Sequence, residues 1–301
     1  MKHSITIAVV LLAAATVQAA EPEGTLDKVK RSGTLVIGIR ESSYPLSYLD
    51  GSGKAVGYHV DICGRVAEDL KARLALPGLK VVQQPVTSQN RIAKMVQGEI
   101  DLECGSTTNN ASRQKDVAFA PTTFVATVRV AVRKDSGLAT LAQLNGKPVA
   151  TTAGSTSVQL LQARQQGRDF TVVEMQGADH AQSFAMLEDG RAAAFVMDDN
   201  LLAGLIAAAK TPGDYALLPD ILSVEPIAVM LRKGDPAFKA VVDDTVKGLM
   251  KRGELDRLYA TWFQSPIPPR QANLNFAMSE VLRNLIRYPS DEPVEAFRSP
   301  E

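Results

Sequence analysis

The chain has 301 residues, of which 45% are hydrophobic and 22% are charged, and its 33 basic residues balance its 33 acidic ones. This composition is typical of a globular protein with a hydrophobic core, and the length suffices for two lobes of ordinary size. A net charge of zero argues against binding to nucleic acid or to an anionic membrane surface, because both favour a basic excess.

The N-terminus has the pattern of a secretory signal peptide. Lys2 and His3 precede an apolar run from Ile5 to Val17, which is too short to span a bilayer, and the small residue Ala19 follows. We predict that residues 1–19 are the signal peptide, that cleavage follows Ala19, and that the mature protein is exported to the periplasm.

Strands and helices alternate along the first part of the mature chain. Apolar, β-rich runs predict strands at 34–39, 79–86 and 100–104, and apolar periodicity predicts helices at 57–74 and 87–96. Such alternation is typical of a mainly parallel sheet that helices cover on both faces.

A similar alternation fills the rest of the chain. Further strands are predicted at 127–132, 148–152 and 227–233, and helices at 236–252 and 255–262. Another strand is predicted to follow Gly190, with Asp198 and Asp199 at its tip. The strand at 227–233 is expected to run back toward the first lobe. Pro266 to Pro269 ends the compact part, and one amphipathic segment, 278–286, lies in the tail.

Two cysteines, Cys63 and Cys104, are present. In an oxidising compartment a cysteine pair is more often bridged than free. Cys63 falls early in a predicted helix that could cover the strand ending at Cys104, so we favour a disulfide over two buried thiols. We expect no metal and no cofactor, because the three histidines are scattered and no Cys-x-x-Cys motif is present.

The most informative segment runs from Cys104 to Arg113. Hydroxyl side chains, a predicted helix start and a fixed cation converge within it, a combination that indicates a receptor for a carboxylate. A second such element, Gly154 to Ser157, follows another apolar strand. Two half-sites on two similar units predict a ligand held between two lobes.

In their order and spacing these motifs resemble those of periplasmic solute-binding proteins of ABC importers for amino acids (family 3), especially the glutamate/aspartate-binding subgroup. The matching segments are 38–43, 86–92, 101–110, 188–192, 197–199 and 262–269. The resemblance implies a two-lobed α/β fold of type II, with mixed sheets flanked by helices and a ligand cleft between the lobes. Lobe one would comprise 25–126 and 226–265, lobe two 127–225, and the C-terminal tail 266–301 would pack on the body.

The resemblance also implies which side chains would pair the charges of a buried α-amino acid. The candidates for the α-carboxylate are Ser106, Thr108, Arg113 and Thr156. Asp198 is the candidate for the α-ammonium group, and we interpret the neighbouring Asp199 as the N-cap of the following helix.

A side-chain carboxylate needs additional positive charge. The candidates for this pocket are Arg40, Ser88, Arg91 and His180, and their charges favour a dicarboxylic amino acid. Glu41 beside Arg40 would partly neutralise the pocket unless it points away, and Glu103 is interpreted as orienting an arginine.

The expected function is binding without catalysis. A monomer would capture glutamate or aspartate and present it, in a closed form, to an inner-membrane ABC permease. Two alternatives stay open. An enzyme of the same fold, such as a cyclic amino-acid dehydratase, would need an unpaired acid or base in the cleft, for which Glu103 is the candidate. A binder of a dicarboxylate without an amino group would not need Asp198.

Overall fold

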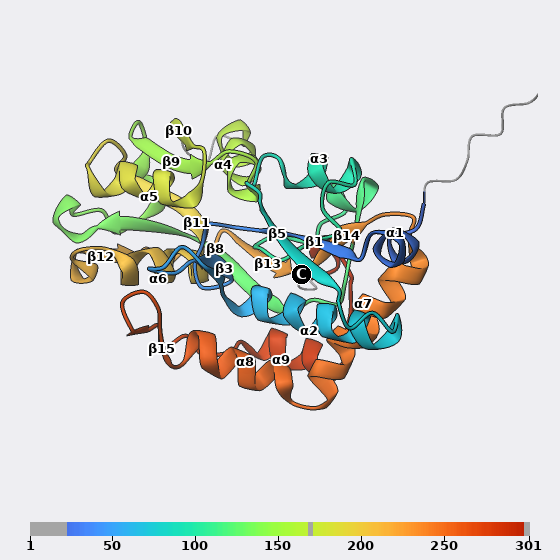
Figure 1. The fold of residues 1–301 in the computed structure, drawn as a ribbon. Coiled ribbons are helices and arrows are strands. Elements are labelled where there is room, and N and C mark those ends of the chain that lie inside the picture. The colour runs from blue at the N-terminus through green and yellow to red at the C-terminus, as the bar shows by residue number, and fades with distance from the viewer. Residues whose placement is uncertain (1–22, 168–170, 298–301) are drawn as a thin grey trace, which may run out of the picture.

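The computed structural model describes residues 23–167 and 171–297, so the predicted signal peptide lies outside the described residues. Two sheets organise the described chain, and helices flank each of them. Figure 1 shows the elements of one sheet at the right and those of the other at the left, with β8 and β13 running between them. Within the described ranges, no helix combines the length and the apolar character that crossing a membrane requires.

Sheet one has five strands in the order β5-β1-β6-β14-β7. Their bounds are β1 Thr34–Ile39, β5 Lys80–Pro85, β6 Leu102–Glu103, β7 Val117–Phe119 and β14 Met230–Arg232. β1 runs parallel to β5 and β6, whereas β14 runs antiparallel to β6 and β7. In β1, Leu35 and residues 37–39 are buried, as expected for a strand that lies between two others under helices on both faces.

Helices cover sheet one, and four of these five helices lie where the sequence predicts them. They are α1 Thr25–Ser32, α2 Tyr58–Arg73, α3 Arg91–Val96, α7 Pro236–Lys251 and α8 Glu254–Phe263. In α2 the buried face contains Ile62, Val66 and Leu70, whose spacing of four residues places them on one side of the helix. The predicted helices are therefore confirmed here, with ends that differ by a few residues.

Sheet two has the order β10-β9-β11-β8-β12, and β13 also pairs with β8. The strands are β8 Phe124–Arg133, β9 Pro148–Thr152, β10 Val173–Gly177, β11 Ala194–Asp198, β12 Tyr215–Leu217 and β13 Ser223–Ile227. Its helices are α4 Thr156–Gln166, α5 His180–Glu188 and α6 Asp199–Ala208. β9 is parallel to β10 and β11, whereas β8 is antiparallel to all its partners, so this sheet is mixed as well.

Two antiparallel strands, β8 and β13, connect the sheets. Ile227 at the end of β13 pairs with Phe124, and β14 begins three residues later, where Met230 pairs with Phe119. The single strand predicted at 227–233 is therefore wrong. The apolar run is continuous in sequence, but its strand pairing changes partner because the chain leaves sheet two after β13 and enters sheet one at β14.

Short elements complete the fold. They are β2 Ser42–Ser43, β3 Ser47–Leu49, β4 Ala55–Val56, β15 Pro266–Ile267, β16 Ala272–Asn273, α9 Glu280–Arg287, and the 3-10 helices η1 Arg113–Lys115, η2 Lys134–Ser136, η3 Leu141–Leu144, η4 Pro212–Asp214 and η5 Val294–Phe297. The segment after α8 contacts the body through the ring of Phe276, which packs against Phe124 and Phe263, and through the Val294 N–H, which donates to the Asn109 carbonyl.

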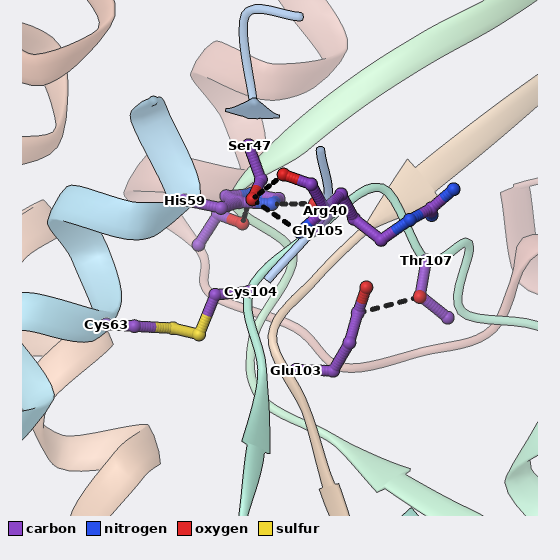
Figure 2. The surroundings of a disulfide bond; sticks show 9 residues. Arg40, Ser47, His59, Cys63, Glu103, Cys104, Gly105 and Thr107 are labelled. Atoms are coloured by element: carbon purple, nitrogen blue, oxygen red, sulfur yellow. Dashed lines mark hydrogen bonds between the residues drawn. A yellow bond between two sulfur atoms is a disulfide. The ribbon is translucent and has the colours of Figure 1, made fainter. Parts of the chain in front are cut away.

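The predicted disulfide is confirmed. Cys63 of α2 is bonded to Cys104, which follows β6, and both residues are fully buried. Figure 2 shows Cys104 pointing toward α2, while its neighbour Glu103 points to the other side of the strand, toward Thr107. The bridge therefore ties the covering helix to the strand end where the carboxylate motif begins.

Replacing both Cys63 and Cys104 with alanine should lower the free energy of unfolding by up to about 4 kcal/mol, because the bridge closes a loop of 41 residues in the unfolded chain. Urea titration of the two proteins measures this difference. A reductant should shift the midpoint of the wild-type protein and leave that of the double variant unchanged. Equal midpoints for both oxidised proteins would contradict the prediction.

Candidate functional site

A small cavity lies where the ends of strands from both sheets face each other. Its lining comprises Ser88, Arg91, Ser106, Thr108, Ser155, Thr156, His180, Met197 and Asp198. Seven of the nine side chains predicted for the site are in this lining, and Ser155 and Met197 are additional. A larger, open groove contains Phe184, Tyr215 and Arg270 but none of the predicted site residues. Its open form and separate lining set it apart from the buried, charged site.

Arg40 lies beside this cavity and connects its two sides. It follows β1 and is buried, with Nη2 donating to Ser88 Oγ at 2.8 Å and to His180 Nε2 at 3.2 Å, and Nη1 donating to Ser106 Oγ at 3.3 Å. Burial, together with the nearby Arg91 charge, lowers the pKa of Arg40 to about 9. The guanidinium therefore stays charged at neutral pH.

His180 begins α5 and is buried against Arg40. Because a guanidinium can only donate hydrogen bonds, His180 Nε2 accepts, which leaves the hydrogen on Nδ1, 3.0 Å from Thr152 Oγ1. Burial and the charges of Arg40 and Arg91 hold the pKa of His180 well below its usual value. His180 lines the cavity as predicted, but the expectation that it adds positive charge is wrong, since two buried arginines face it.

Arg91, the first residue of α3, is a second buried cation. Its Nε has no hydrogen-bond partner among the described residues. Burial lowers the pKa of Arg91, and the negative charges of Glu103, Asp198 and Glu225 oppose this shift. An unpaired donor at the cavity is available to an anion that enters it.

Glu103 is fully buried under the cavity. Its Oε2 accepts from Thr107 Oγ1 at 2.7 Å, and its Oε1 has no partner within the described chain. The interpretation that Glu103 orients an arginine by a direct hydrogen bond is wrong, because Glu103 accepts its hydrogen bond from Thr107. Its charge nevertheless offsets those of Arg40 and Arg91. A Cβ at Gly105 would collide with this carboxylate and with the Arg40 side chain, so glycine is required there.

The carboxylate motif adopts a different local structure from the one predicted. The only helix in this motif is the three-residue η1, which begins at Arg113. The residues before it are extended along β13: Thr108 forms a β-bridge with Ile227, and the Asn109 N–H donates to the Pro226 carbonyl at 2.8 Å. The predicted polar helix is therefore wrong. Pairing with β13 places the Thr108 side chain at the cavity.

Arg113 begins η1 and spans the gap between the sheets. Its Nη1 donates to the Thr108 carbonyl at 2.8 Å and its Nη2 to the Gly154 carbonyl at 3.5 Å. Burial of the guanidinium, together with the charge of Arg91, lowers the pKa of Arg113 to about 9. Arg113 therefore contacts both half-sites that the sequence identified.

Glu225 of β13 is a site residue that the sequence analysis missed. It is buried, and its Oε2 accepts from Thr108 Oγ1 at 2.6 Å and from Thr156 Oγ1 at 2.7 Å. These hydroxyls are two of the donors predicted for the ligand's α-carboxylate. The available signal was an acidic residue inside a short crossing segment, but only the fold brings it against two threonines of the cavity lining.

Asp198 lines the cavity, as the sequence predicts, but Asp199 is not the N-cap of α6. α6 begins at Asp199, whose carboxylate accepts from the Thr127 N–H and hydroxyl, so the interpretation of Asp199 as the N-cap is wrong. Asp198 holds the N-cap position but caps no N–H, and it lines the cavity instead. Burial and the charges of Glu225 and Asp199 raise the pKa of Asp198 well above its usual range.

Neither Glu41 nor a metal site adds charge to the buried pocket of the described chain. Glu41 is exposed, so it is not part of the buried pocket. No group of three or more His, Cys, Asp or Glu side chains that could hold a metal ion occurs in the part of the chain that the structure describes. The cavity thus combines buried guanidinium groups, hydroxyls and the buried carboxylate of Asp198, an arrangement suited to a small zwitterion with additional negative charge.

His59 supports the site from α2. Its Nδ1 contacts the Gly105 carbonyl, and its Nε2 lies 2.8 Å from Thr123 Oγ1. Burial lowers the pKa of His59 to about 4, below its usual 6.5. The unfolded chain therefore binds a proton at a higher pH than the folded protein does, so stability is complete above about pH 6.5 and falls as the pH drops toward 4.

His59→Gln should remove this dependence. We expect the wild-type protein to lose about 3 kcal/mol more unfolding free energy than the variant between pH 7 and pH 4, since His180 remains in both proteins. Urea titrations at several pH values provide the measurement. Parallel pH profiles would show that His59 does not carry the effect.

Comparison with known proteins agrees with this architecture. The profile of bacterial extracellular solute-binding proteins, family 3, matches residues 35–265. The chain is 45% identical over 291 residues to an L-glutamate/L-aspartate-binding protein of Pseudomonas aeruginosa, covering 96% of each chain. It is 42% identical over 268 residues to a glutamate/aspartate import solute-binding protein of Escherichia coli, covering 89% of each chain.

Solved structures share the fold. A mutant of ArgBP from T. maritima superposes with a TM-score of 0.70 at 26% identity, covering 79% of this chain and 99% of that one. An ancestral amino-acid-binding protein, described as a precursor of cyclohexadienyl dehydratase, superposes with a TM-score of 0.67 at 28% identity, covering 79% and 99%. The expected two-sheet fold of type II is confirmed, and the chain belongs to the family 3 bacterial extracellular solute-binding proteins.

Proposed function

We propose that this protein binds glutamate and aspartate in the periplasm and delivers them, as a monomer, to an ABC-type permease. The observation that carries the proposal is a buried cavity at which Arg40, Arg91 and Arg113 converge from separate segments. Two relatives whose names specify glutamate and aspartate, at 42% and 45% identity over most of the chain, support the same ligand class.

In this proposal each end of the ligand has its own partners. The α-carboxylate is bound by Arg113 with donors from Ser106, Thr108 and Thr156, and Asp198 accepts from the α-ammonium group. The side-chain carboxylate is bound by the remaining candidates, Arg40, Ser88, Arg91 and His180. The contacts of Arg40 with Ser88 and His180 support grouping these three residues.

The proposed lobes follow the two sheets. Lobe one (25–126 and 226–265) contains the strands of sheet one, and lobe two (127–225) contains most of sheet two, with β8 and β13 as the crossings. The tail, 266–301, would complete the body. Ligand would bridge the lobes and favour the closed arrangement.

The alternatives are less well supported. Glu103, the candidate acid or base for an enzyme, is engaged by Thr107 and is absent from the cavity lining. The relatives are named as binding proteins. A dicarboxylate without an amino group would leave Asp198 buried and unpaired, which is costly.

Calorimetry on the mature protein, freed of endogenous ligand by unfolding and refolding, tests the proposal. Glutamate and aspartate should each bind at one site, and glutamine and glutarate much more weakly. Tight binding of glutamine would refute the assignment of the side-chain pocket. Tight binding of glutarate would refute the role of Asp198, and silence from all four ligands would refute the proposed function.

A further inference from the structure

Two buried hydroxyl groups stand behind His180, at the ring nitrogen that does not contact Arg40. Thr152, the last residue of β9, has its Oγ1 3.0 Å from His180 Nδ1 and 2.9 Å from Ser183 Oγ. Neither Thr152 nor Ser183 lines the cavity, and both are fully buried. A hydroxyl has a single hydrogen to donate, so Thr152 donates to one of these two partners and accepts from the other.

The surroundings of Ser183 decide this direction. Its Oγ lies 2.8 Å from the carbonyl oxygen of Asp179 and 2.9 Å from that of Thr151. Because a carbonyl oxygen can only accept, the Ser183 hydrogen points to these two oxygens, and a lone pair is left for Thr152. The reverse direction would leave the Ser183 lone pairs facing two carbonyl oxygens. Thr152 therefore donates to Ser183.

The direction of this hydrogen bond fixes the position of the hydrogen on the His180 ring. Since Thr152 gives its only hydrogen to Ser183, it can only accept from His180, so Nδ1 carries the ring hydrogen. Nε2 of the neutral ring is then an acceptor, in agreement with its 3.2 Å contact with Arg40 Nη2. The contacts at the two ring nitrogens thus require the same tautomer.

The backbone holds Ser183 beside Thr152. The Ser183 N–H donates to the Asp179 carbonyl at 3.0 Å, within α5. Gly177, the last residue of β10, pairs with Thr152 in the parallel ladder, and a Cβ there would collide with the side chain and the backbone of Ser183. The absence of a side chain at Gly177 therefore lets α5 approach the strand ends closely enough for the two hydroxyls to meet.

Resting on the proposed function, we propose that Thr152 and Ser183 are positioning residues for the ligand's side-chain carboxylate. They fix His180 as a hydrogen-bond acceptor, and His180 in turn holds one N–H group of the Arg40 guanidinium. His180 therefore acts on the ligand through Arg40. With its hydrogen on Nε2, the ring would present an N–H to the N–H groups of Arg40, and the guanidinium would have to turn away.

Nitrogen-15 NMR of the ligand-free protein at neutral pH tests this tautomer, because protonated and unprotonated ring nitrogens have different chemical shifts. Removal of residues 1–19 leaves two histidines, so the variant His59→Gln identifies the signals of His180. We expect the hydrogen on Nδ1 in the wild-type protein. In Ser183→Ala the Thr152 hydroxyl is free to donate to Nδ1. The tautomer with hydrogen on Nε2 should then gain population, and glutamate affinity should fall about fivefold to tenfold.

Two substitutions of Thr152 separate positioning from packing. Thr152→Val keeps the shape but removes the hydroxyl, so it should disturb the tautomer and weaken glutamate binding about tenfold. Thr152→Ser keeps the hydroxyl and should retain the wild-type tautomer and affinity. A role in packing alone would give the opposite order, because serine leaves a gap of one methyl group. Wild-type behaviour of Thr152→Val, or equal losses in both variants, would overturn the inference.

Ser265→Ala is the control for the loss of a serine hydroxyl. Ser265 Oγ donates to the Ala260 carbonyl at 2.9 Å outside the cavity lining, so this variant should bind glutamate like the wild-type protein. A hydrogen on Nε2 of His180 in the wild-type protein would overturn the inference alone, whether or not the variants of Thr152 and Ser183 fold. No binding of glutamate or aspartate by the wild-type protein would overturn the proposed function and the inference with it.

Discussion

Replacing Asp198 with asparagine should weaken glutamate binding by about two to four orders of magnitude. Removing one partner of a buried charge pair costs about 3–5 kcal/mol, because the other charge stays buried without compensation. Asp198 is 4% exposed, lines the cavity and caps no N–H of α6, so asparagine should leave the fold intact. Calorimetry of glutamate and aspartate measures the loss.

Two controls distinguish the loss of the ammonium contact from a general loss of ligand binding. Glutarate lacks the ammonium group, so its binding should not weaken in Asp198→Asn. Asp189→Asn changes an exposed carboxylate that pairs with Arg191 at 2.7 Å, and it should bind glutamate like the wild-type protein. Equal losses for glutamate and glutarate would show that Asp198 does not bind the ammonium group.

Gly204→Ala should weaken glutamate binding by about one to two orders of magnitude while the protein stays folded. Gly204 lies in α6 beside sheet two, and a Cβ there would stand 2.5 Å from the carbonyl oxygen of Tyr44, which follows β2 beside sheet one. Overpacking of this kind costs about 1–3 kcal/mol. This energy destabilises the closed arrangement, in which α6 contacts Tyr44 and the two sheets enclose the ligand.

The same substitution should not lower thermal stability in the absence of ligand, because alanine favours a helix by about 1 kcal/mol over glycine. Gly64→Ala in α2 is the matched control, since a Cβ there meets no atom within 4 Å. Calorimetry gives the affinities, and small-angle scattering reports whether the variant is more open. An unchanged affinity in Gly204→Ala would show that this contact does not limit closure.

The sequence predicted more of the fold than of the site. β1 was predicted at 34–39, where the structure has Thr34–Ile39, because short apolar runs bounded by polar turns are a local signal. The helices α2 and α7 were predicted within two residues of their observed ends, since their apolar faces repeat with the helical period. The break between β13 and β14 was missed, because a change of ladder partner leaves no mark in an apolar run.

The chemical types of the site residues were determined by the sequence alone: arginines, hydroxyls and one aspartate follow strand ends in recognisable motifs. Their protonation and pairing were decided only by the tertiary structure. Burial against two arginines makes His180 neutral, and Thr108 and Thr156 become partners of Glu225 only where β13 passes between the sheets. Hydrogen bonds and desolvation depend on which groups meet in space, and 69 residues separate Thr156 from Glu225 in the chain.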